Sequence, residues 1–576
     1  MLARVLTATG LLAAVATVAA PVAAARDPIV PLSDVHRGMT CTARTVVQGT
    51  AIATFGVEVL DVVDDISGTG PRILVRVSGD AVAGSGIASG FSGSPVYCAD
   101  RTGAIGNAGA VSATIGQYGN DVGLVTPIEQ MLGLSAKPPS GARKATRAEA
   151  ASARPLAAPL TITGLSPALG RLVERAGRAV GRTFVAAPAG PLGTFAPQPL
   201  VPGASMAAAY STGAIGASAV GTVTYRDGAT VYGFGHQLDG AGRRSLVLQD
   251  AYVFTVVDNP LDTSESSSYK LAAPGHALGT LSNDAPAAVV GSVGERAPTI
   301  PFSVTVRDRD RGRTLRQRTD VADEVDVGDP TGHGLLPTIG PMALAQAVTA
   351  AFDGAPARES GRLCLRVKVR EARTPLRFCN RYVVNGEDTG GVPALALAMG
   401  EDVASALTAV DQARFANLHV TSAAAEVTFS RGLELATIVG VGGPSTLRRG
   451  ARARVRLRVR EFRGPLRTIP VTLAVPRDAP LGPQQLRIAG TPLDTVDSGG
   501  ETTLVIDVGG GGGDGTGGGG AQSMDEVRAR FGATERYDGL KVRLGAARWR
   551  APRYGSLRID GRGTLDVQVV AKRAVR

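Results

Sequence analysis

Residues 73–97 read ILVRVSGDAVAGSGIASGFSGSPVY, and this stretch sets the structural character of the chain. It opens with the apolar run Ile73–Val77, which is typical of a strand, and passes through closely spaced glycines before a second such run begins at Val96. Val57–Leu60, upstream, has the same strand-like character. Short strands separated by glycine-rich turns predict a small β-barrel or sandwich over residues 26–135.

The composition extends this prediction to the whole protein. Of its 576 residues, 75 are glycine and 35 are proline, whereas aromatic residues make up only 4%. This balance favours many short strands and turns over long packed helices. The length also exceeds what one ordinary core accommodates. We therefore expect a mainly β, multidomain protein with few short helices.

Shifts in composition divide the chain into units. Residues 136–158 are rich in Ala, Pro, Lys, Arg and Ser, as in a solvated linker, and a second linker beginning at Gly509 is mostly glycine. The expected units are a β-unit at 26–135, the linker at 136–158, a β-unit at 159–310, an α+β region with a disulfide-stapled hairpin at 311–414, a β-sandwich at 415–508, the glycine-rich linker at 509–522, and a C-terminal helix with strands at 523–576.

The first 25 residues have the order of a secretory signal peptide. Arg4 precedes an apolar run from Val5 to about Ala20, and small residues lead to a cleavage site expected after Ala25. The alternative is an uncleaved membrane anchor, although the run is short for a bilayer span of about 20 residues. No later segment is long and apolar enough to span. We expect a secreted or cell-envelope protein, extracytoplasmic, with no transmembrane span in the mature chain.

Four cysteines fit export, because an oxidising compartment lets thiols pair. Among the three possible connectivities, we predict that Cys41 pairs with Cys98 and Cys364 with Cys379. The second pair would staple two strand-like runs joined by a turn. Zinc binding is the alternative, and it is disfavoured because no Cys-x-x-Cys or nearby histidine supplies the ligand spacing. We therefore expect no metal and no cofactor.

The formal net charge is +11, and positive charge is most concentrated in RARVRLRVR at residues 452–460. Arginine alternates there with apolar residues at the period of a strand, so one face would be guanidinium and the other core. We expect this Arg452–Arg460 face to be exposed, with an anionic cell-envelope polymer or lipid head group as its candidate partner. A solvated face that only keeps the domain soluble is the alternative. No specific nucleic-acid binding is expected.

The segment GFSGSP at residues 90–95 is the main candidate for chemistry. A serine nucleophile needs a sharp, glycine-lined turn, so that its Oγ projects while nearby backbone N–H groups point at the developing oxyanion. The layout matches the Gly-x-Ser-Gly-x-Pro turn of chymotrypsin-like proteases. By that analogy Ser92 is the nucleophile, and the N–H groups of Gly90 and Ser92 form the oxyanion hole. A turn that only joins strands is the structural alternative.

The base of such a site is nearly always a histidine, and the chain has five. His236 follows a Gly-Phe-Gly turn at the end of a strand-like run, where its side chain can reach a cleft between two β-units. His36 precedes the first strands, His276 and His333 fall in expected loops, and His419 begins the expected sandwich. We therefore select His236, with a purely structural histidine as the alternative.

Two longer segments resemble the SpoIVB-type serine peptidases. GSGIASGFSGSPVY at 84–97, followed by GLVTPIEQML at 123–132, is similar to the serine region of that family. The histidine region of its secreted multidomain branch resembles four short segments here: GTVTY at 221–225, GFGH at 233–236, SYKLA at 268–272 and GTL at 279–281. The resemblance covers roughly residues 36–310.

The resemblance implies an endopeptidase with a chymotrypsin-like two-barrel catalytic core that acts on exported or membrane-associated proteins or peptides. Ser92 would be its nucleophile and His236 its base. SpoIVB has its histidine before its serine, so the two halves would meet here in permuted order. No PDZ-like segment is recognisable between them, and Phe91 stands where the family usually has methionine.

The third member of the site and the function itself have alternatives. The family's acid lies upstream of the serine, which implies Asp80, the nearest upstream carboxylate. Asp239 is closer to His236 in sequence, and a Ser-His dyad without an acid is a further alternative. The alternative function is a non-catalytic envelope scaffold that binds protein or anionic wall polymer, in which the serine turn merely closes a barrel.

Overall fold

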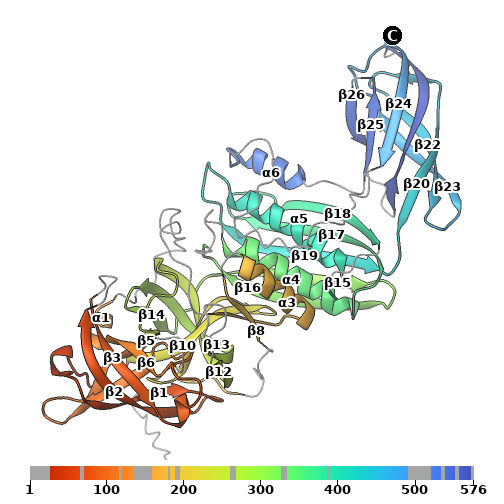
Figure 1. The fold of residues 1–576 in the computed structure, drawn as a ribbon. Helices are drawn as coiled ribbons and strands as arrows, with labels where there is room; N and C mark the ends of the chain where they lie inside the picture. The colour runs from red at the N-terminus through yellow and green to blue at the C-terminus, as the bar shows by residue number, and fades with distance from the viewer. Residues whose placement is uncertain are drawn as a thin grey trace, which may run out of the picture.

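The computed structural model describes residues 26–64, 70–115, 120–134, 136, 159–179, 182–187, 195–259, 268–325, 334–385, 390–490, 520–533, 539–545, 547–551 and 557–571. The expected signal peptide, nearly all of the first linker and most of the glycine-rich linker lie outside these residues. Figure 1 shows an elongated arrangement, with the N-terminal strands at one end, a broad sheet covered by helices in the middle, and the last strands at the other end.

The N-terminal unit is a closed six-stranded barrel with the order β1-β2-β3-β6-β5-β4, in which β4 pairs back onto β1. Its strands are β1 (Thr40–Val46), β2 (Ile52–Asp64), β3 (Pro71–Ser78), β4 (Pro95–Ala99), β5 (Ile105–Thr114) and β6 (Val122–Pro127). Alternate residues point inward, so that Phe55, Val75 and Phe91 are almost fully buried in its core. The barrel expected over residues 26–135 is confirmed.

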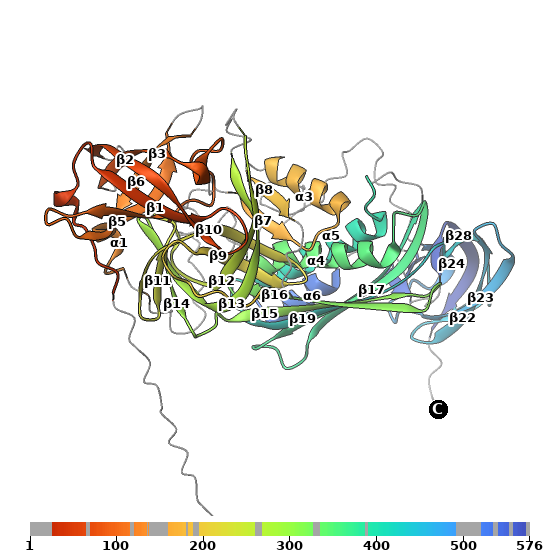
Figure 2. The ribbon, with the colours of Figure 1, turned by 90° about the horizontal axis from the view of Figure 1, so that it is seen from below.

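A second closed ring of six strands lies within a larger 13-stranded sheet. Its strands are β9 (Ser205–Gly213), β10 (Gly216–Asp227), β11 (Thr230–Gly233), β12 (Gly242–Val257), β13 (Tyr269–Ala285) and β14 (Ala288–Val293). The ring runs β9-β10-β11-β14-β13-β12 and closes because β9 pairs with both β10 and β12. Counted within each barrel, the strand order is 1-2-3-6-5-4 in both. The expected two-barrel architecture is confirmed, and Figure 2 shows the barrels side by side.

Further strands extend the sheet beyond the second barrel. They are β15 (Thr299–Asp308), β16 (Arg313–Ala322), β17 (Arg358–Val369), β18 (Leu376–Asn385) and β19 (Val420–Ser430) on one side, with β7 (Leu160–Thr163) and β8 (Phe184–Ala187) on the other. The sandwich was expected to begin at residue 415. Instead, β19 pairs in parallel with β15 and antiparallel with β17, so it belongs to this sheet.

Helices cover the extended sheet. They are α3 (Pro167–Ala179), α4 (Leu335–Phe352), α5 (Ala394–Asp411) and, after the glycine-rich linker, α6 (Met524–Ala533), while the short α1 (Ile128–Met131) follows the first barrel. Within the described part of the chain, α4 is the one helix long and apolar enough to cross a membrane, and 89% of that stretch is buried inside the protein. Ser523 accepts a hydrogen bond from the N–H of Glu526, as expected for a helix cap at this position.

The C-terminal unit is a sandwich of two sheets. One consists of β20 (Leu435–Gly442), β22 (Arg452–Glu461), β23 (Leu466–Ala474) and β27 (Arg558–Asp560), and the other of β21 (Thr446–Arg448), β24 (Gly482–Gly490), β25 (Leu540–Leu544), β26 (Ala547–Ala551) and β28 (Arg562–Val570). The strands after residue 539 were expected to form a separate C-terminal unit, but they complete this sandwich. The strand-like run at 504–508 lies outside the described residues.

Both predicted disulfides are present. Cys41 on β1 is bonded to Cys98 on β4, and Cys364 on β17 faces Cys379 on β18 across the hairpin. The Arg452–Arg460 face is also confirmed as exposed, because its five arginines point to solvent while Val455, Leu457 and Val459 are fully buried.

Candidate active site

The serine turn follows the third strand of the first barrel. It occupies the connection between β3 and β4, and positive φ angles at Gly90 (93°) and Gly93 (94°) give it its sharp course. The Ser94 hydroxyl is buried and donates to the carbonyl of Phe91 at 2.6 Å, which gives it a structural role. Ser92 is partly exposed, and in the described part of the chain its Oγ has no hydrogen-bond partner. Of the two serines, Ser92 is therefore the one available for reaction.

The backbone N–H groups of this turn fall into two sets. Those of Phe91, Gly93 and Ser94 donate to backbone carbonyls at 2.7 to 2.9 Å. Those of Gly90 and Ser92 have no acceptor among the described residues. Backbone donors without a protein acceptor are free to bind solvent or a ligand, and these two lie on either side of Phe91. They are the two groups that the sequence assigns to the oxyanion hole.

The carbonyls of the same turn are held from the second barrel. Thr222 on β10 donates its backbone N–H to the Ser92 carbonyl at 2.8 Å and its hydroxyl to the Gly90 carbonyl at 3.0 Å. The Thr224 hydroxyl donates to the Gly93 carbonyl at 2.8 Å, and the N–H of Lys270 on β13 donates to the Ser89 carbonyl at 2.9 Å. The second barrel therefore sets the peptide planes of the serine turn.

The His236 turn occupies the equivalent position in the second barrel. It follows β11, the third strand, and positive φ angles at Phe234 and Gly235 (69° each) reverse the chain before His236. Its brace comes from the first barrel, because the Thr126 hydroxyl on β6 donates to the Gly235 carbonyl at 2.6 Å. Each barrel thus supports the functional turn of the other.

The two turns touch directly. A Cβ added to Gly93 would lie 2.4 Å from the backbone nitrogen of Phe234, so only glycine fits at this contact. Ser92 immediately precedes Gly93, and His236 follows Phe234 by two residues. Among the described residues, no hydrogen bond joins the Ser92 hydroxyl to the His236 ring. The structure therefore brings the two turns together without a direct bond between the two side chains.

The tautomer of His236 follows from its only described polar contact. Its Nδ1 lies 2.6 Å from the backbone carbonyl of Gln237, and because a carbonyl can only accept, Nδ1 carries the proton. Nε2 then presents a lone pair. Burial lowers the pKa of His236 below its usual value, and the bond to the Gln237 carbonyl only partly offsets this. The ring is therefore neutral near pH 7, as a general base must be.

The expected acid is not in contact with the histidine. Asp80 is exposed at the start of η2 (Asp80–Val82), and no described hydrogen bond connects it to His236. The carboxylate of Asp239 accepts from Tyr210 and Arg244, both at 2.7 Å. A backbone carbonyl, that of Gln237, and not a carboxylate, is the described partner of the His236 ring.

A buried polar network fixes the segment after His236. Asp284 on β13 accepts the N–H groups of Leu238 and Asp239 at 2.5 and 2.7 Å. Arg244 is fully buried between the carboxylates of Asp239 and Glu324. Burial raises the pKa of Asp284, and the neighbouring Asp239 raises it further. This network stabilises the loop. The carboxylates of Asp239 and Asp284 already have hydrogen-bond donors within it.

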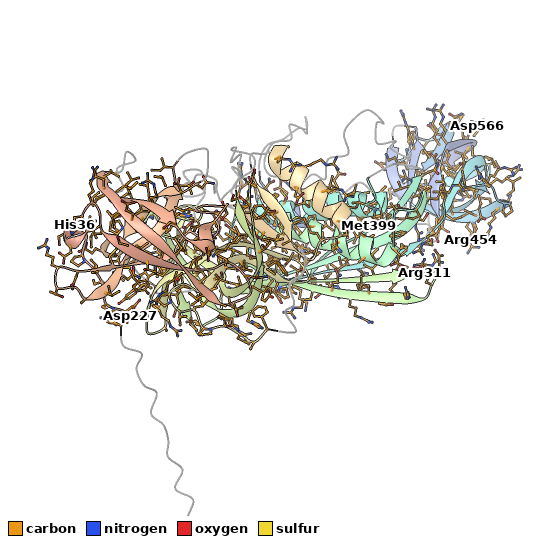
Figure 3. The ribbon with its side chains drawn as sticks, turned by 60° about the horizontal axis from the view of Figure 1, so that its bottom comes forward. His36, Asp227, Arg311, Met399, Arg454 and Asp566 are labelled. Carbon is orange, nitrogen blue, oxygen red and sulfur yellow. A yellow bond between two sulfur atoms is a disulfide. The ribbon has the colours of Figure 1, made fainter. Side chains whose placement is uncertain are left out.

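The remaining histidines have other settings. His276 was expected in a loop, but it lies within β13, where its Nδ1 is 3.0 Å from Asp250 on β12. Asp250 also accepts the backbone N–H groups of Gln198 and His276 itself. His419 pairs with Glu371, His36 lies near the N-terminus of the first barrel (Figure 3), and His333 is outside the described residues. No described contact links any of them to the serine turn.

Sequence reasoning assigned no role to Thr222 or Lys270, although both lie in segments that resemble the peptidase family. The local signal for Lys270 is a lysine directly before the apolar run Leu271–Ala273. Neither residue lies in a short sequence motif with the residues that it contacts, because those contacts join positions far apart in the sequence.

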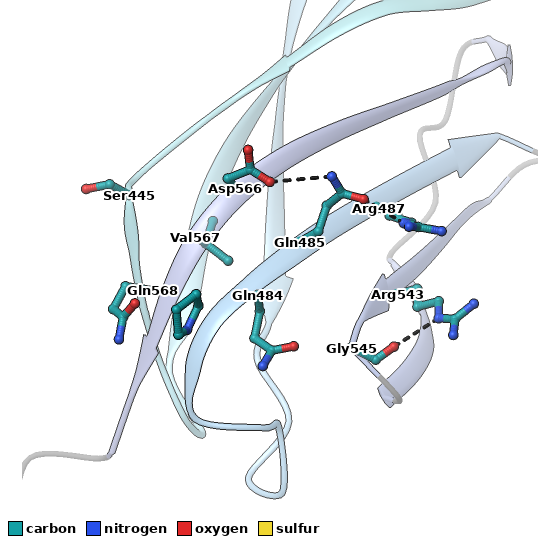
Figure 4. A pocket seen from close by; sticks show the side chains of 10 residues that line it. Ser445, Gln484, Gln485, Arg487, Arg543, Gly545, Asp566, Val567 and Gln568 are labelled. Atoms are coloured by element: carbon teal, nitrogen blue, oxygen red, sulfur yellow. Dashed lines mark hydrogen bonds between the residues drawn. The ribbon is translucent and has the colours of Figure 1, made fainter.

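A pocket lies on a different part of the protein. This pocket of about 670 Å³ on the sandwich is lined by polar side chains of β24, β25 and β28, and Figure 4 shows Gln485 bonded to Asp566 there. It contains no residue of the serine or histidine turn. The candidate active site is therefore identified by its turns and their donors, and not by the volume of a cavity.

No protein-family model matches the sequence, and no curated protein is similar to it.

Proposed function

We propose that the protein is a secreted serine endopeptidase of the SpoIVB type that cleaves exported or membrane-associated proteins. The observation that carries this proposal is that, among the described residues, the N–H groups of Gly90 and Ser92 and the Ser92 hydroxyl have no partner. The next residue, Gly93, contacts Phe234 of the His236 turn. The two disulfides are compatible with an extracytoplasmic location.

The reaction follows from the roles of these groups. Nε2 of His236 takes the proton of the Ser92 hydroxyl while Oγ attacks the carbonyl carbon of a peptide bond. The Gly90 and Ser92 N–H groups stabilise the negative charge that develops on the carbonyl oxygen. The C–N bond breaks as His236 returns the proton to the leaving amine, and water then releases the acyl group. Catalytic hydrogen bonds often tighten only when substrate is bound, which fits the missing Ser92–His236 bond.

A fluorophosphonate probe tests this proposal directly. We expect the mature protein to be labelled at Ser92, with labelling lost in Ser92→Ala and His236→Ala. His276→Ala is the matched control, because this histidine has an aspartate partner but no link to the serine turn. Labelling that survives Ser92→Ala, or a folded wild-type protein that is never labelled, would contradict the proposal.

A second candidate function, binding to an anionic envelope polymer, rests on the Arg452–Arg460 face. Arg452, Arg454, Arg456, Arg458 and Arg460 project from one side of β22 (Arg454 in Figure 3), spaced about 7 Å apart because alternate residues share a face. Among the described residues none of the five forms an ion pair. An unpaired row of guanidinium groups favours an extended polyanion over a compact ligand.

A further inference from the structure

Lys270 is a buried lysine beside the serine turn. It lies on β13, is 3% exposed, and donates from Nζ to the hydroxyls of Thr45 at 2.8 Å and Thr222 at 3.1 Å. Nζ also lies 5.1 Å from the centre of the Phe91 ring. No carboxylate in the described part of the chain pairs with it. Burial alone lowers the pKa of Lys270 to about 7.

The direction of the hydrogen bonds around Lys270 is fixed by chemistry. The Thr222 hydroxyl has one hydrogen and gives it to the Gly90 carbonyl at 3.0 Å, so it must accept from its other neighbours. The Lys270 nitrogen carries N–H donors whether or not it is charged, and it donates to both threonine hydroxyls. Thr45 lies 3.3 Å from Thr222 and completes the cluster from the first barrel. The chain of donors therefore runs from Lys270 through Thr222 to Gly90.

Lys270 also constrains Gly90 through its backbone and its methylene groups. Its N–H holds the Ser89 carbonyl, in the peptide plane that carries the Gly90 N–H. Its side chain underlies Gly90 so closely that an added Cβ there would lie 3.2 Å from three of its carbons. Lys270 thus holds the Ser89–Gly90 peptide plane directly and the Gly90–Phe91 plane through Thr222. A glycine needs such external support, because it adopts several conformations with little cost.

We propose that Lys270 is a positioning residue of the oxyanion hole, because it holds the peptide plane that carries the Gly90 N–H directly and the next plane through Thr222. That the turn binds an oxyanion rests on the proposed peptidase function. That Lys270 orders the turn rests only on the contacts described above. Of the neighbouring charged groups, Arg44 on β1 stacks on Tyr97, and no described contact joins the Asp258 carboxylate to Lys270. Lys270 is therefore the cation at this position that supports the turn.

The test compares Lys270→Met, Thr222→Val and the double variant, with Lys368→Met on β17 as an exposed-lysine control. Methionine keeps the length and apolar stem of lysine but cannot donate, and the backbone bonds of both residues remain. Two quantities are measured: the rate at which a fluorophosphonate labels Ser92, and the amide hydrogen exchange of the segment 86–97. The melting temperature of each variant establishes that it is folded.

We expect Lys270→Met to slow labelling by about 10- to 100-fold, less than the loss of a whole oxyanion donor, and to speed exchange within residues 86–97. Because Lys270 acts through Thr222, the double variant should be no slower than the slower single variant. Unchanged labelling and exchange in a folded Lys270→Met protein would overturn the positioning role. Complete loss of labelling in Lys270→Met, with labelling retained in His236→Ala, would make Lys270 the base and also overturn it.

The exchange measurement separates this inference from the proposed function. If the wild-type protein is never labelled, the peptidase proposal fails. Faster exchange of the 86–97 segment in Lys270→Met would still show that Lys270 orders the turn, and unchanged exchange would refute it.

Discussion

Gly93 of the first barrel and Phe234 of the second are in backbone contact, so that even a methyl group on Gly93 would lie 2.4 Å from the Phe234 nitrogen. The same methyl group would lie 2.0 Å from the carbonyl oxygen of Thr222. Both are backbone atoms in strands or tight turns, and they cannot move aside as the end of a flexible side chain can. Docking of the two barrels therefore depends on the absence of a side chain at residue 93.

Gly93→Ala should consequently separate the two turns. Alanine in a left-handed conformation costs about 1 to 2 kcal/mol wherever it is placed, and the backbone clash adds to this at Gly93. Gly103→Ala is the matched control, because Gly103 has a similar φ of 87° with open space around it. We expect a clearly larger drop in the denaturant midpoint for Gly93→Ala than for Gly103→Ala, together with loss of Ser92 labelling. Equal midpoints would refute the contact.

The pH dependence of labelling should reflect the lowered pKa of His236. Only the neutral imidazole accepts the Ser92 proton, so the rate falls as pH drops through the pKa of the folded protein. We expect the midpoint of this acid limb below 6.5, the usual pKa of histidine. Because the unfolded chain binds this proton more readily, stability should also decline below pH 6.5, and less so in His236→Gln. A midpoint above 6.5 would contradict the burial argument.

Lys270 should affect the pH dependence of stability on the alkaline side of pH 7. Its pKa is about 7 in the folded protein and about 10.4 in an unfolded chain, so between these values the unfolded chain binds more protons. This contribution to stability rises with pH across that window and is smallest below pH 7. We expect the wild-type protein to gain stability relative to Lys270→Met from pH 7 to pH 10 in urea titrations. Parallel profiles for the two proteins would show that Lys270 keeps its proton.

The two disulfides should differ in their contributions. In the chain-entropy model a loop of about 15 residues is worth about 3 kcal/mol and a loop of 57 residues about 4 kcal/mol. Removing the pair Cys41 and Cys98 by alanine substitution should therefore lower the free energy of unfolding more than removing Cys364 and Cys379. The first loss should also reduce Ser92 labelling, because this bond ties β1 to β4, where the serine turn ends. The reverse order of stability would contradict the model.

The Arg452–Arg460 face should retain the protein on an anionic matrix. Changing Arg454, Arg456 and Arg458 to glutamine removes three positive charges without touching the core side of β22. The triple change of Arg362, Arg366 and Arg377, all exposed on β17 and β18, is a control of equal charge. We expect only the first variant to elute at markedly lower salt, since screening acts on exposed charges. Equal shifts would indicate an effect of net charge alone.

The sequence correctly predicted features that depend only on residues close together in the chain. The alternation at residues 452–460 requires only the two-residue period of a strand, and the pairing of Cys364 with Cys379 requires only a hairpin. His276 was misplaced because Pro274 and Gly275 suggest a loop, whereas a register shift at that point lets β13 continue through them.

The parts of the site that were not predicted depend on distant residues. Lys270 meets Thr45 across 225 positions, and no periodicity or motif encodes such a contact. The parallel pairing of β19 with β15 is also long-range, which explains why β19 seemed to open the sandwich. The contact of His236 with the Gln237 carbonyl depends on the path of the backbone after the turn. Any residue at position 237 has a carbonyl, so the sequence does not predict this contact.

The reciprocal bracing of the two turns has a consequence for synthesis. Thr224, which holds the Gly93 carbonyl, follows Gly93 by 131 residues, so a growing chain contains the serine turn long before its support exists. A first barrel that folds as it emerges carries a serine whose surrounding peptides are not yet held in place. If the proposed hydrolytic activity exists, it requires the second barrel, which supplies both His236 and this support, to be made and docked first.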